Sequence, residues 1–305
     1  MLPVLEVQAS AQLGAFTYAQ ARSAGYTEAE VRARVSSGRW QRLRRGAYTP
    51  AATWEAADER ARHGILAVAA ALTVGADAAV SHTSAALLLG APTLGWPDQV
   101  QVTRGSGGHR IGGAVVHRAP LPTADVLVRG ATRLTAAGRT LLDVARTEPF
   151  RAAVVIADGL LRAGLLDAAD LDAMRGVPLT GRGAGAARRV LAFADGLSDN
   201  PGESLSRVAL HSAGLPPPEL QVEIAARGPD GPGIRVDFLW RRQRLVGEFD
   251  GRLKYQAPGD LYAEKRREDR IRAMGYGVVR WGWAEAYGDF GPIAARIRAL
   301  LASGA

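Results

Sequence analysis

The sequence predicts an α+β protein with more than one domain, and three observations support this prediction. The chain has 305 residues, about twice the length of a typical domain. Helix patterns and strand patterns both occur along it. Hydrophobic residues make up 47% of the chain, which is ample for packed cores. We expect three domains, over residues 1–50, 51–196 and 197–305.

Composition and charge narrow the classes of function. The chain has no cysteine, which excludes disulfide scaffolds, thiolate zinc sites, iron–sulfur clusters and a cysteine nucleophile. Its formal net charge of +8 favours a polyanionic partner such as nucleic acid. The first residues lack a basic segment, and the most apolar stretch, 65–74, is too short to span a bilayer. We expect a cytoplasmic protein with no membrane partner and leave its oligomeric state open.

The block at residues 1–50 contains two helix signals followed by a hairpin pattern. Capping boxes begin short helices at Thr17 and Thr27, and Gly25 and Gly38 can end them. Residues 40–49 can form a small basic hairpin. Two short helices joined by a tight turn and followed by a hairpin predict a winged helix, a DNA-binding fold.

Arginines dominate the charge of this first block, which has seven Arg against three Glu. We expect the second helix to enter the major groove, and the hairpin to contact phosphates. The residues expected to contact DNA are Arg32, Ser36, Arg39, Arg42, Arg44 and Arg45. The alternative is a small helical domain that is coated with arginine and does not bind DNA.

The block at residues 51–196 predicts a mixed, mainly helical middle domain. Helices are expected near residues 56–74, 82–90, 136–147, 150–163 and 183–195, and strands at 99–103 and 114–118. His82 is expected to begin a helix rather than to act as a base. The histidines of this block lack the HExxH spacing, so no metal site is expected here. The glycines at 181, 183 and 185 indicate a linker.

The block at residues 197–305 predicts the order α-β-β-β-α-β-α. Asn200 caps the first helix, with Pro201 in its first turn and Glu203 at the capping-box position. The expected helices cover 201–213, 261–274 and 293–301, and the expected strands cover 220–224, 234–240, 245–250 and 276–281.

Two of these strands bring acidic side chains together. If Trp240 and Leu245 flank the hairpin loop, Asp237 lies opposite Glu248, and Asp250 shares the face of Glu248. Two opposed carboxylates repel each other unless a cation neutralises them. Carboxylates are ligands of Mg²⁺ and Mn²⁺. The sequence therefore predicts a divalent-metal site with Asp237 and Glu248 as metal ligands.

The two lysines of the chain lie beside this acidic cluster. Lys254 follows Asp250 by four residues, and Lys265 lies in the next helix, whereas every other basic residue is arginine. An ammonium group can hold a water molecule and stabilise a developing phosphorane charge. The alternatives are a chance position for both lysines, and a surface pair of Lys265 with Asp269.

Several spaced motifs of residues 197–285 carry a resemblance. They are Pro201-Gly-Glu203-Ser, Val236-Asp-Phe238, Glu248-Phe-Asp250-Gly, Lys254-Tyr, Glu264-Lys265-x-x-Glu268-Asp269-x-x-Arg272 and Val279-Arg-Trp281. They are similar to the very-short-patch-repair-like endonuclease domains of the PD-(D/E)XK superfamily. The resemblance implies a restriction-endonuclease-like αβββαβ domain that uses Mg²⁺, with Asp237 and Glu248 as metal ligands and Glu203 as an accessory acid.

The chain departs from this superfamily at one motif. The superfamily pattern is Glu-x-Lys, whereas this chain has Glu248-Phe249-Asp250. The role of the lysine would then pass to Lys254 or Lys265. The departure concerns catalytic competence, not fold.

A second resemblance covers residues 1–130. The run Gly38-Arg-Trp40-Gln-Arg-Leu-Arg-Arg-Gly46-Ala-Tyr48 and the later Ser81-His82-x-Ser84-Ala85 are similar to AbiEi-type antitoxins of type IV toxin–antitoxin systems. That resemblance implies binding to the protein's own promoter DNA and a cognate toxin as partner.

Three hypotheses of function follow. The first is a DNA-bound, Mg²⁺-dependent endonuclease with Glu203, Asp237, Glu248, Asp250, Lys254 and Lys265 as its catalytic set. The second is an antitoxin-like autorepressor whose nuclease fold is catalytically inert. The third is an antitoxin that acts through protein contacts.

Structural roles are the alternative for several of these residues. Glu203 can simply close a capping box or pair with Arg207. Asp269 can brace the site with Arg272. Trp240, Trp281 and Trp283 are expected in the core rather than as surfaces on which bases stack.

Overall fold

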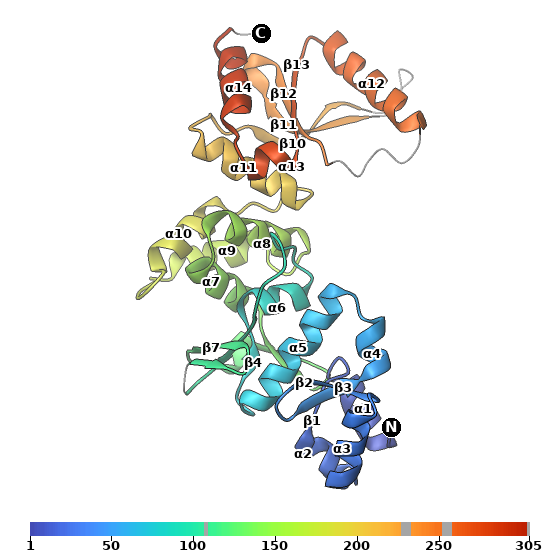
Figure 1. Ribbon diagram of the computed structural model, residues 1–305. Coiled ribbons are helices and arrows are strands. Elements are labelled where there is room, and N and C mark those ends of the chain that lie inside the picture. The colour runs from blue at the N-terminus through green and yellow to red at the C-terminus, as the bar shows by residue number, and fades with distance from the viewer. Residues whose placement is uncertain (107–108, 227–232, 252–257, 304–305) are drawn as a thin grey trace. The chain divides into compact units, whose positions relative to one another are not determined.

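The computed structural model describes residues 1–106, 109–226, 233–251 and 258–303, with the backbone alone at 109–111 and 258–264. Contacts group the chain into two compact units (Figure 1). The first unit is Met1–Pro149 with Ala163–Ala192, and the second is Phe150–Arg162 with Phe193–Ala305. Helices and three sheets confirm the predicted α+β class. Within the described ranges, no helix has the length and apolar character needed to cross a membrane.

The first unit opens with a winged helix, as predicted. Its elements are α1 (Pro3–Ser10), β1 (Phe16–Thr17), α2 (Tyr18–Ser23), α3 (Glu28–Ser36), β2 (Trp40–Arg44) and β3 (Ala47–Pro50). The strands form a three-stranded sheet in the order β1-β3-β2. Helix α1 was not predicted, because no side chain caps its N-terminus at Leu2.

The predicted capping boxes are both formed. Thr17 Oγ1 accepts from the Gln20 N–H at 3.1 Å, and Gln20 Oε1 accepts from the Thr17 N–H at 2.8 Å. Thr27 and Glu30 make the same reciprocal pair at 3.2 and 2.7 Å. These bonds satisfy backbone donors that have no partner within a helix, so the local sequence is enough to set both starts.

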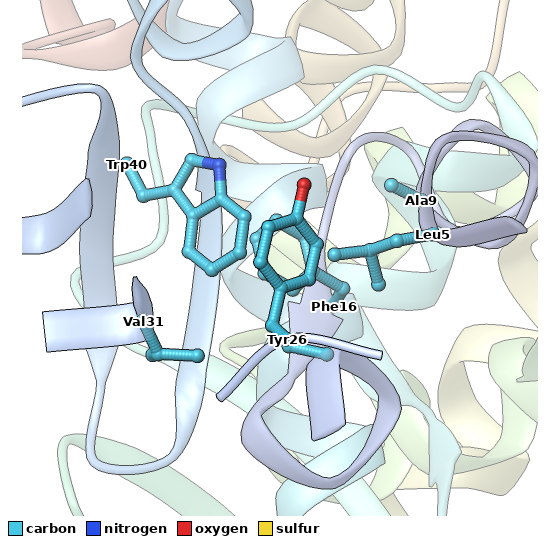
Figure 2. Close-up of a cluster of buried hydrophobic side chains, with 7 residues drawn as sticks. Leu5, Ala9, Phe16, Tyr26, Val31 and Trp40 are labelled. Atoms are coloured by element: carbon cyan, nitrogen blue, oxygen red, sulfur yellow. The ribbon is translucent and has the colours of Figure 1, made fainter. Parts of the chain in front are cut away.

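Aromatic rings hold the winged helix together. Figure 2 shows the cluster in which Trp40 of β2 lies beside Tyr26 and Phe16. The Trp40 ring meets Phe16 edge-on at 4.7 Å and Tyr26 edge-on at 5.0 Å between ring centroids. The Tyr26 hydroxyl accepts from the Leu2 N–H at 2.8 Å, which fixes the start of α1. The β2–β3 hairpin and helices α1 and α3 thus share one hydrophobic core.

The rest of the first unit is a six-stranded sheet with helices. The elements are α4 (Ala51–Ala56), α5 (Glu59–Val74), β4 (Ala79–Val80), α6 (His82–Leu89), β5 (Val100–Arg104), β6 (His109–Ile111), β7 (Ala114–Arg118), β8 (Val126–Arg129), β9 (Thr132–Thr135), α7 (Ala137–Thr147), α9 (Ala168–Gly176) and α10 (Ala184–Phe193). The strand order is β6-β7-β5-β4-β9-β8. A 3₁₀ turn, Thr123–Asp125, precedes β8.

Helix α5 also packs against the winged helix. Ile65, Val68 and Ala69 of α5 lie in one buried cluster with Ala15 and Ala47. The wing, which is the β2–β3 hairpin, therefore rests on a helix of the middle block. The predicted division into domains 1–50, 51–196 and 197–305 stays a prediction.

The elements of the second unit are α8 (Phe150–Arg162), α11 (Pro201–Ser212), β10 (Glu219–Ala225), β11 (Ile234–Trp240), β12 (Leu245–Phe249), α12 (Pro258–Ala273), β13 (Gly277–Trp281), α13 (Trp283–Tyr287) and α14 (Gly291–Ser303). From α11 onward the predicted elements follow in the predicted order, but the short helix α13 was not predicted, and α8 was predicted as part of the middle domain. The sheet order is β10-β11-β12-β13, with β12 and β13 parallel. A 3₁₀ turn at Arg241–Gln243 joins β11 to β12.

The sheet of the second unit is covered on both faces, with α12 on one side and α11 and α14 on the other (Figure 1). Ile271 of α12 packs with Val236, Val246 and Val278 on the first face. On the opposite face, the Trp281 Nε1–H donates to Ser206 Oγ of α11 at 2.7 Å. Both faces of the sheet therefore make apolar or buried contacts with helices, and the polar residues Asp237 and Glu248 lie within its strands.

Candidate nucleic-acid interface

The winged helix presents most of the predicted DNA-contacting side chains to solvent. Arg32, Ser36, Arg39, Arg42 and Arg45 are exposed. We call these five residues the winged-helix surface. Arg32 pairs with Glu28 one turn earlier on α3. That pair is exposed and therefore contributes little to stability, so Arg32 can exchange Glu28 for another anion at little cost.

Arg44 differs from the other predicted contacts. It is half-buried, and burial lowers the pKa of its guanidinium. A Cβ added at Gly112 in the β6–β7 turn would lie 3.0 Å from Arg44 Nη2, so the guanidinium packs closely on that turn. Because this side chain is directed into the first unit, the structure does not place Arg44 with the exposed winged-helix surface.

Arg34 of α3 packs on two aromatic rings of the winged-helix core. Its guanidinium lies 4.9 Å from the ring centroid of Tyr26 and 5.5 Å from that of Trp40. This cation–π contact joins α3 to the aromatic core of Figure 2. The sequence pattern did not identify Arg34, since its partners lie eight and six residues away and depend on the tertiary fold.

In the second unit, the structure brings Glu203 and Asp237 together. The Gln221 Nε2–H donates to Glu203 Oε2 at 2.7 Å and to Asp237 Oδ1 at 3.3 Å. Gln221 was not identified from the sequence. Its backbone has a φ of 50°, which is uncommon for a residue with a side chain. The residue with this conformation is therefore the one whose side chain contacts both carboxylates.

Glu203 is buried and closes the start of α11. It is 4% exposed, and its Oε2 also accepts from the Asp199 N–H at 2.7 Å. The Glu203 N–H donates to Asn200 Oδ1 at 3.0 Å, as expected for a capped helix. Burial, and then the negative charge of Asp237, raise the pKa of Glu203 to about 7. The predicted cap by Asn200 is confirmed, but Glu203 does not close a capping box, since its carboxylate accepts from the Asp199 N–H and not from the Asn200 N–H. Arg207 pairs with Asp158 at 2.7 Å instead of with Glu203.

The predicted register of the β11–β12 hairpin is confirmed where the ladder is formed. Trp240 pairs with Leu245 and Phe238 with Gly247. Beyond that point the Phe249 N–H donates to Asp237 Oδ2 at 2.9 Å. Asp237 is thus bound to the end of β12 through its carboxylate.

Glu248 lies between two arginines, Arg267 and Arg280, that were not predicted to be its neighbours. It is buried, and Arg267 of α12 lies with Nη2 2.8 Å from its Oε1. Arg267 Nη1–H also donates to Oε2 at 2.8 Å, and Arg280 Nη2 of β13 lies 3.2 Å from Oε2. Two cations therefore neutralise the carboxylate for which a metal ion was predicted.

This arrangement does not fit Mg²⁺ or Mn²⁺ between Asp237 and Glu248. A divalent ion would have to displace both guanidinium groups from a buried carboxylate. Among the described residues, no group of three or more His, Asp or Glu side chains is arranged to hold a metal ion.

The remaining predicted residues are spread around this cluster. Asp250 follows β12 and is half-buried, and its N–H donates to Trp281 O at 2.8 Å. Lys265 is exposed on α12, and Lys254 lies outside the described residues. The proposed brace between Asp269 and Arg272 is replaced by a pair of Arg272 with Glu268 at 2.6 Å, because Glu268 lies one full turn earlier.

The three tryptophans of this unit divide into two groups. Trp240 and Trp281 are 4% and 3% exposed, so their predicted place in the core is confirmed. Trp283 is 40% exposed, so the same prediction is wrong for it. It begins the short helix α13 after Gly282.

The histidines of the middle block lie in a buried polar cluster. His82 begins α6, as predicted, and its ring stacks on His117 at 3.6 Å between centroids. His82 Nδ1 lies 2.9 Å from Ser81 Oγ and 3.9 Å from Asp143 Oδ2. Burial lowers the pKa of His82 to about 2, so the ring is neutral at physiological pH. These contacts join α6, β7 and α7.

Comparison with known proteins adds the family of the N-terminal part. Residues 6–51 match the family AbiEi_4, described as "Transcriptional regulator, AbiEi antitoxin". Two curated relatives are the uncharacterized proteins MT2308 and Rv2248 of Mycobacterium tuberculosis, from strains CDC 1551 / Oshkosh and ATCC 25618 / H37Rv. Each is 31% identical over 163 residues, which are 53% of this chain and 59% of the relative. The chain thus matches little more than half the length of these relatives. The matched residues cover nearly all of the winged helix, so this part of the chain is similar to the AbiEi antitoxin family of transcriptional regulators.

Proposed function

We propose that this protein is a DNA-binding transcriptional regulator of the AbiEi antitoxin type, acting in the cytoplasm on its own promoter. In this proposal α3 enters the major groove, and the wing lies along the phosphate backbone. A cognate toxin is the expected protein partner. The proposal is supported by the family match at residues 6–51 and by the geometry of the winged helix.

The observation that carries the proposal is the exposed arginine set on one winged helix. Arg32 and Ser36 lie one turn apart on α3 and can reach base edges, while Arg39, Arg42 and Arg45 flank or lie on the wing and can reach phosphates. The aromatic core beneath them keeps α3 and the wing in one rigid arrangement. A rigid set of guanidinium groups is suited to bidentate contacts with guanine and phosphate.

The test is binding of the full chain to duplex DNA from its own upstream region, measured by fluorescence anisotropy. We expect Arg32→Ala to weaken binding to the upstream duplex by about 1–3 kcal/mol, the value for one lost base contact. The preference of the protein for this duplex over a scrambled duplex should fall as well. Arg42→Ala should weaken binding to both duplexes by the same factor, since a phosphate contact does not depend on sequence. The matched control is Arg182→Ala, which removes the same charge from an exposed position outside the winged helix. Equal losses in the control and in both variants would refute the proposal.

For the second unit, we propose a nuclease-like fold that is catalytically inert. The support is the position of Glu248 between Arg267 and Arg280, together with the motif Glu248-Phe249-Asp250, which lacks the lysine of the superfamily pattern. Metal-dependent cleavage stays a prediction, with Mg²⁺ or Mn²⁺ as its cofactor. It requires the arginines to leave Glu248.

Calorimetry separates these two possibilities. We expect titration of the full chain with Mn²⁺ to give no binding heat that depends on Asp237. Saturable heat that is lost in Asp237→Ala, together with DNA nicking lost in the same variant, would overturn the inert assignment. Duplex binding by the winged helix is measured separately and does not depend on this result.

A further inference from the structure

Two exposed aromatic rings lie on one face of α13 in the second unit. Trp283 is 40% exposed and Tyr287 is 50% exposed. They are four residues apart on a helix, so their side chains are neighbours on the same face. Arg151 of α8 lies beside Tyr287, with its guanidinium 4.5 Å from the centroid of that ring. We call Trp283, Tyr287 and Arg151 the aromatic patch.

Each member of the aromatic patch is held in place by a specific contact. The Trp283 ring meets Phe249 edge-on, with 5.2 Å between centroids and 89° between planes. Phe249 in turn lies against Gly202, where an added Cβ would come within 2.1 Å of the phenylalanine ring. Arg151 Nη1–H donates to Tyr287 O at 3.3 Å, which keeps the guanidinium over the tyrosine. The patch is therefore arranged before any ligand arrives.

The neighbouring acidic side chains are engaged by the backbone. Glu285 Oε2 accepts from the Gly282 N–H at 2.9 Å at the start of α13. Asp289 Oδ1 accepts from the Gly291 N–H at 2.8 Å. Arg151 is exposed and forms the cationic part of the patch, in a chain whose formal net charge is +8. Arg151 is thus the member of the patch that can face an anionic group of a ligand.

We propose that the aromatic patch binds unpaired nucleotides of single-stranded DNA. Trp283 and Tyr287 would each stack on a base, and Arg151 would face a phosphate or stack on a further base. Aromatic rings near a cationic group are the usual means by which proteins bind single strands without reading their sequence. The proposal goes beyond the winged-helix function, which concerns duplex DNA and lies in the other compact unit.

The experiment uses the full chain and a fluorescein-labelled oligo(dT) of about 20 nucleotides, with affinity measured by anisotropy at low salt. One lost base stack corresponds to an affinity loss between about 5-fold and 150-fold, and we expect this loss in Trp283→Ala. Trp283→Phe should keep part of the affinity, since a smaller ring still stacks. Tyr287→Ala should weaken binding as well.

The matched control is Trp96→Ala, which removes a tryptophan that is 46% exposed in the first unit. It should leave the oligo(dT) affinity unchanged. Circular dichroism checks that each variant is folded. If Trp283→Ala does not fold, Trp283→Phe is measured in its place. The proposal fails if folded Trp283 and Tyr287 variants bind oligo(dT) within two-fold of wild type, as a protein-binding patch would predict. It also fails if Arg42→Ala removes this binding and the patch variants do not.

Discussion

Glu203→Gln is expected to change how the stability of the second unit depends on pH. Glu203 is 4% exposed and lies beside Asp237, with Gln221 donating to both carboxylates. Burial first, and then the charge of Asp237, raise its pKa from an ordinary 4.5 to about 7. The folded protein therefore keeps this proton at pH values where the unfolded chain has already lost it.

The sign and size follow from this difference in proton binding. Below pH 4.5 both states are protonated, so the stabilising effect is fully present. Between pH 4.5 and about 7 the folded state binds more protons, so the free energy of unfolding falls as the pH rises. One pKa unit corresponds to about 1.4 kcal/mol, so the whole fall is about 3 kcal/mol. Glutamine does not ionise and should remove this contribution.

The assay is urea unfolding at pH 5 and pH 8, followed by fluorescence and by hydrogen-exchange mass spectrometry of β11 and β12. Between the two pH values, the free energy of unfolding of wild type should fall by about 2.5 kcal/mol more than that of Glu203→Gln, because the unfolded carboxyl is already mostly ionised at pH 5. Burial raises the pKa of Asp158 to about 6, so Asp158 also makes the free energy of unfolding depend on pH. That contribution is the same in wild type and in Glu203→Gln, so it cancels when the two are compared. Glu223→Gln, an exposed change on the same strand as Gln221, is the control and should follow wild type. Parallel profiles for wild type and Glu203→Gln would refute the reasoning.

Three further changes test the packing around these sites. Trp40→Ala should lower the free energy of unfolding of the first unit by about 3–5 kcal/mol in urea, because Trp40 is 4% exposed among three aromatic rings; a loss below 1 kcal/mol would contradict this. Gly202→Ala should lower thermal stability by about 1–3 kcal/mol, since the new Cβ would lie 2.1 Å from the Phe249 ring, and Phe249→Leu should restore part of it. Arg280→Met should lower the free energy of unfolding of the second unit, measured in urea, by about 2 kcal/mol, because buried Glu248 loses one of its two cationic partners. An unchanged free energy of unfolding would show that this ion pair is not formed.

Local signals in the sequence predicted much of the fold. The starts of α2, α3 and α11 are set by side chains that bond to backbone groups three residues away, so a short window contains the whole cause. The β11–β12 register is also local, since a short turn joins the two strands. The six-stranded sheet was largely missed, because β4 has two residues and β8 has four, which leaves no alternation to detect.

The neighbours of the acidic site depend on the tertiary fold. Glu248 and Arg280 are paired in parallel strands, and the chain between them passes through α12. A crossover of that length does not fix which residue of β13 lies beside Glu248, so the ion pair has no signature in the sequence. Asp237 was found from the strand alternation and the hairpin register, and Glu203 from the capping-box pattern, both of which are local. Gln221 has no such motif, and its contact follows from the position of β10 beside β11.

The direct test of the winged-helix assignment is the salt dependence of duplex binding. For wild type and for Arg39→Ala with Arg42→Ala, the affinity for the upstream duplex is measured between about 50 and 200 mM salt. Each lost phosphate contact reduces the slope of log affinity against log salt by about 0.9, so the double variant should have a slope smaller by about 1.8. An unchanged slope would mean that these exposed arginines do not meet DNA, and it would contradict the assignment of the winged-helix surface.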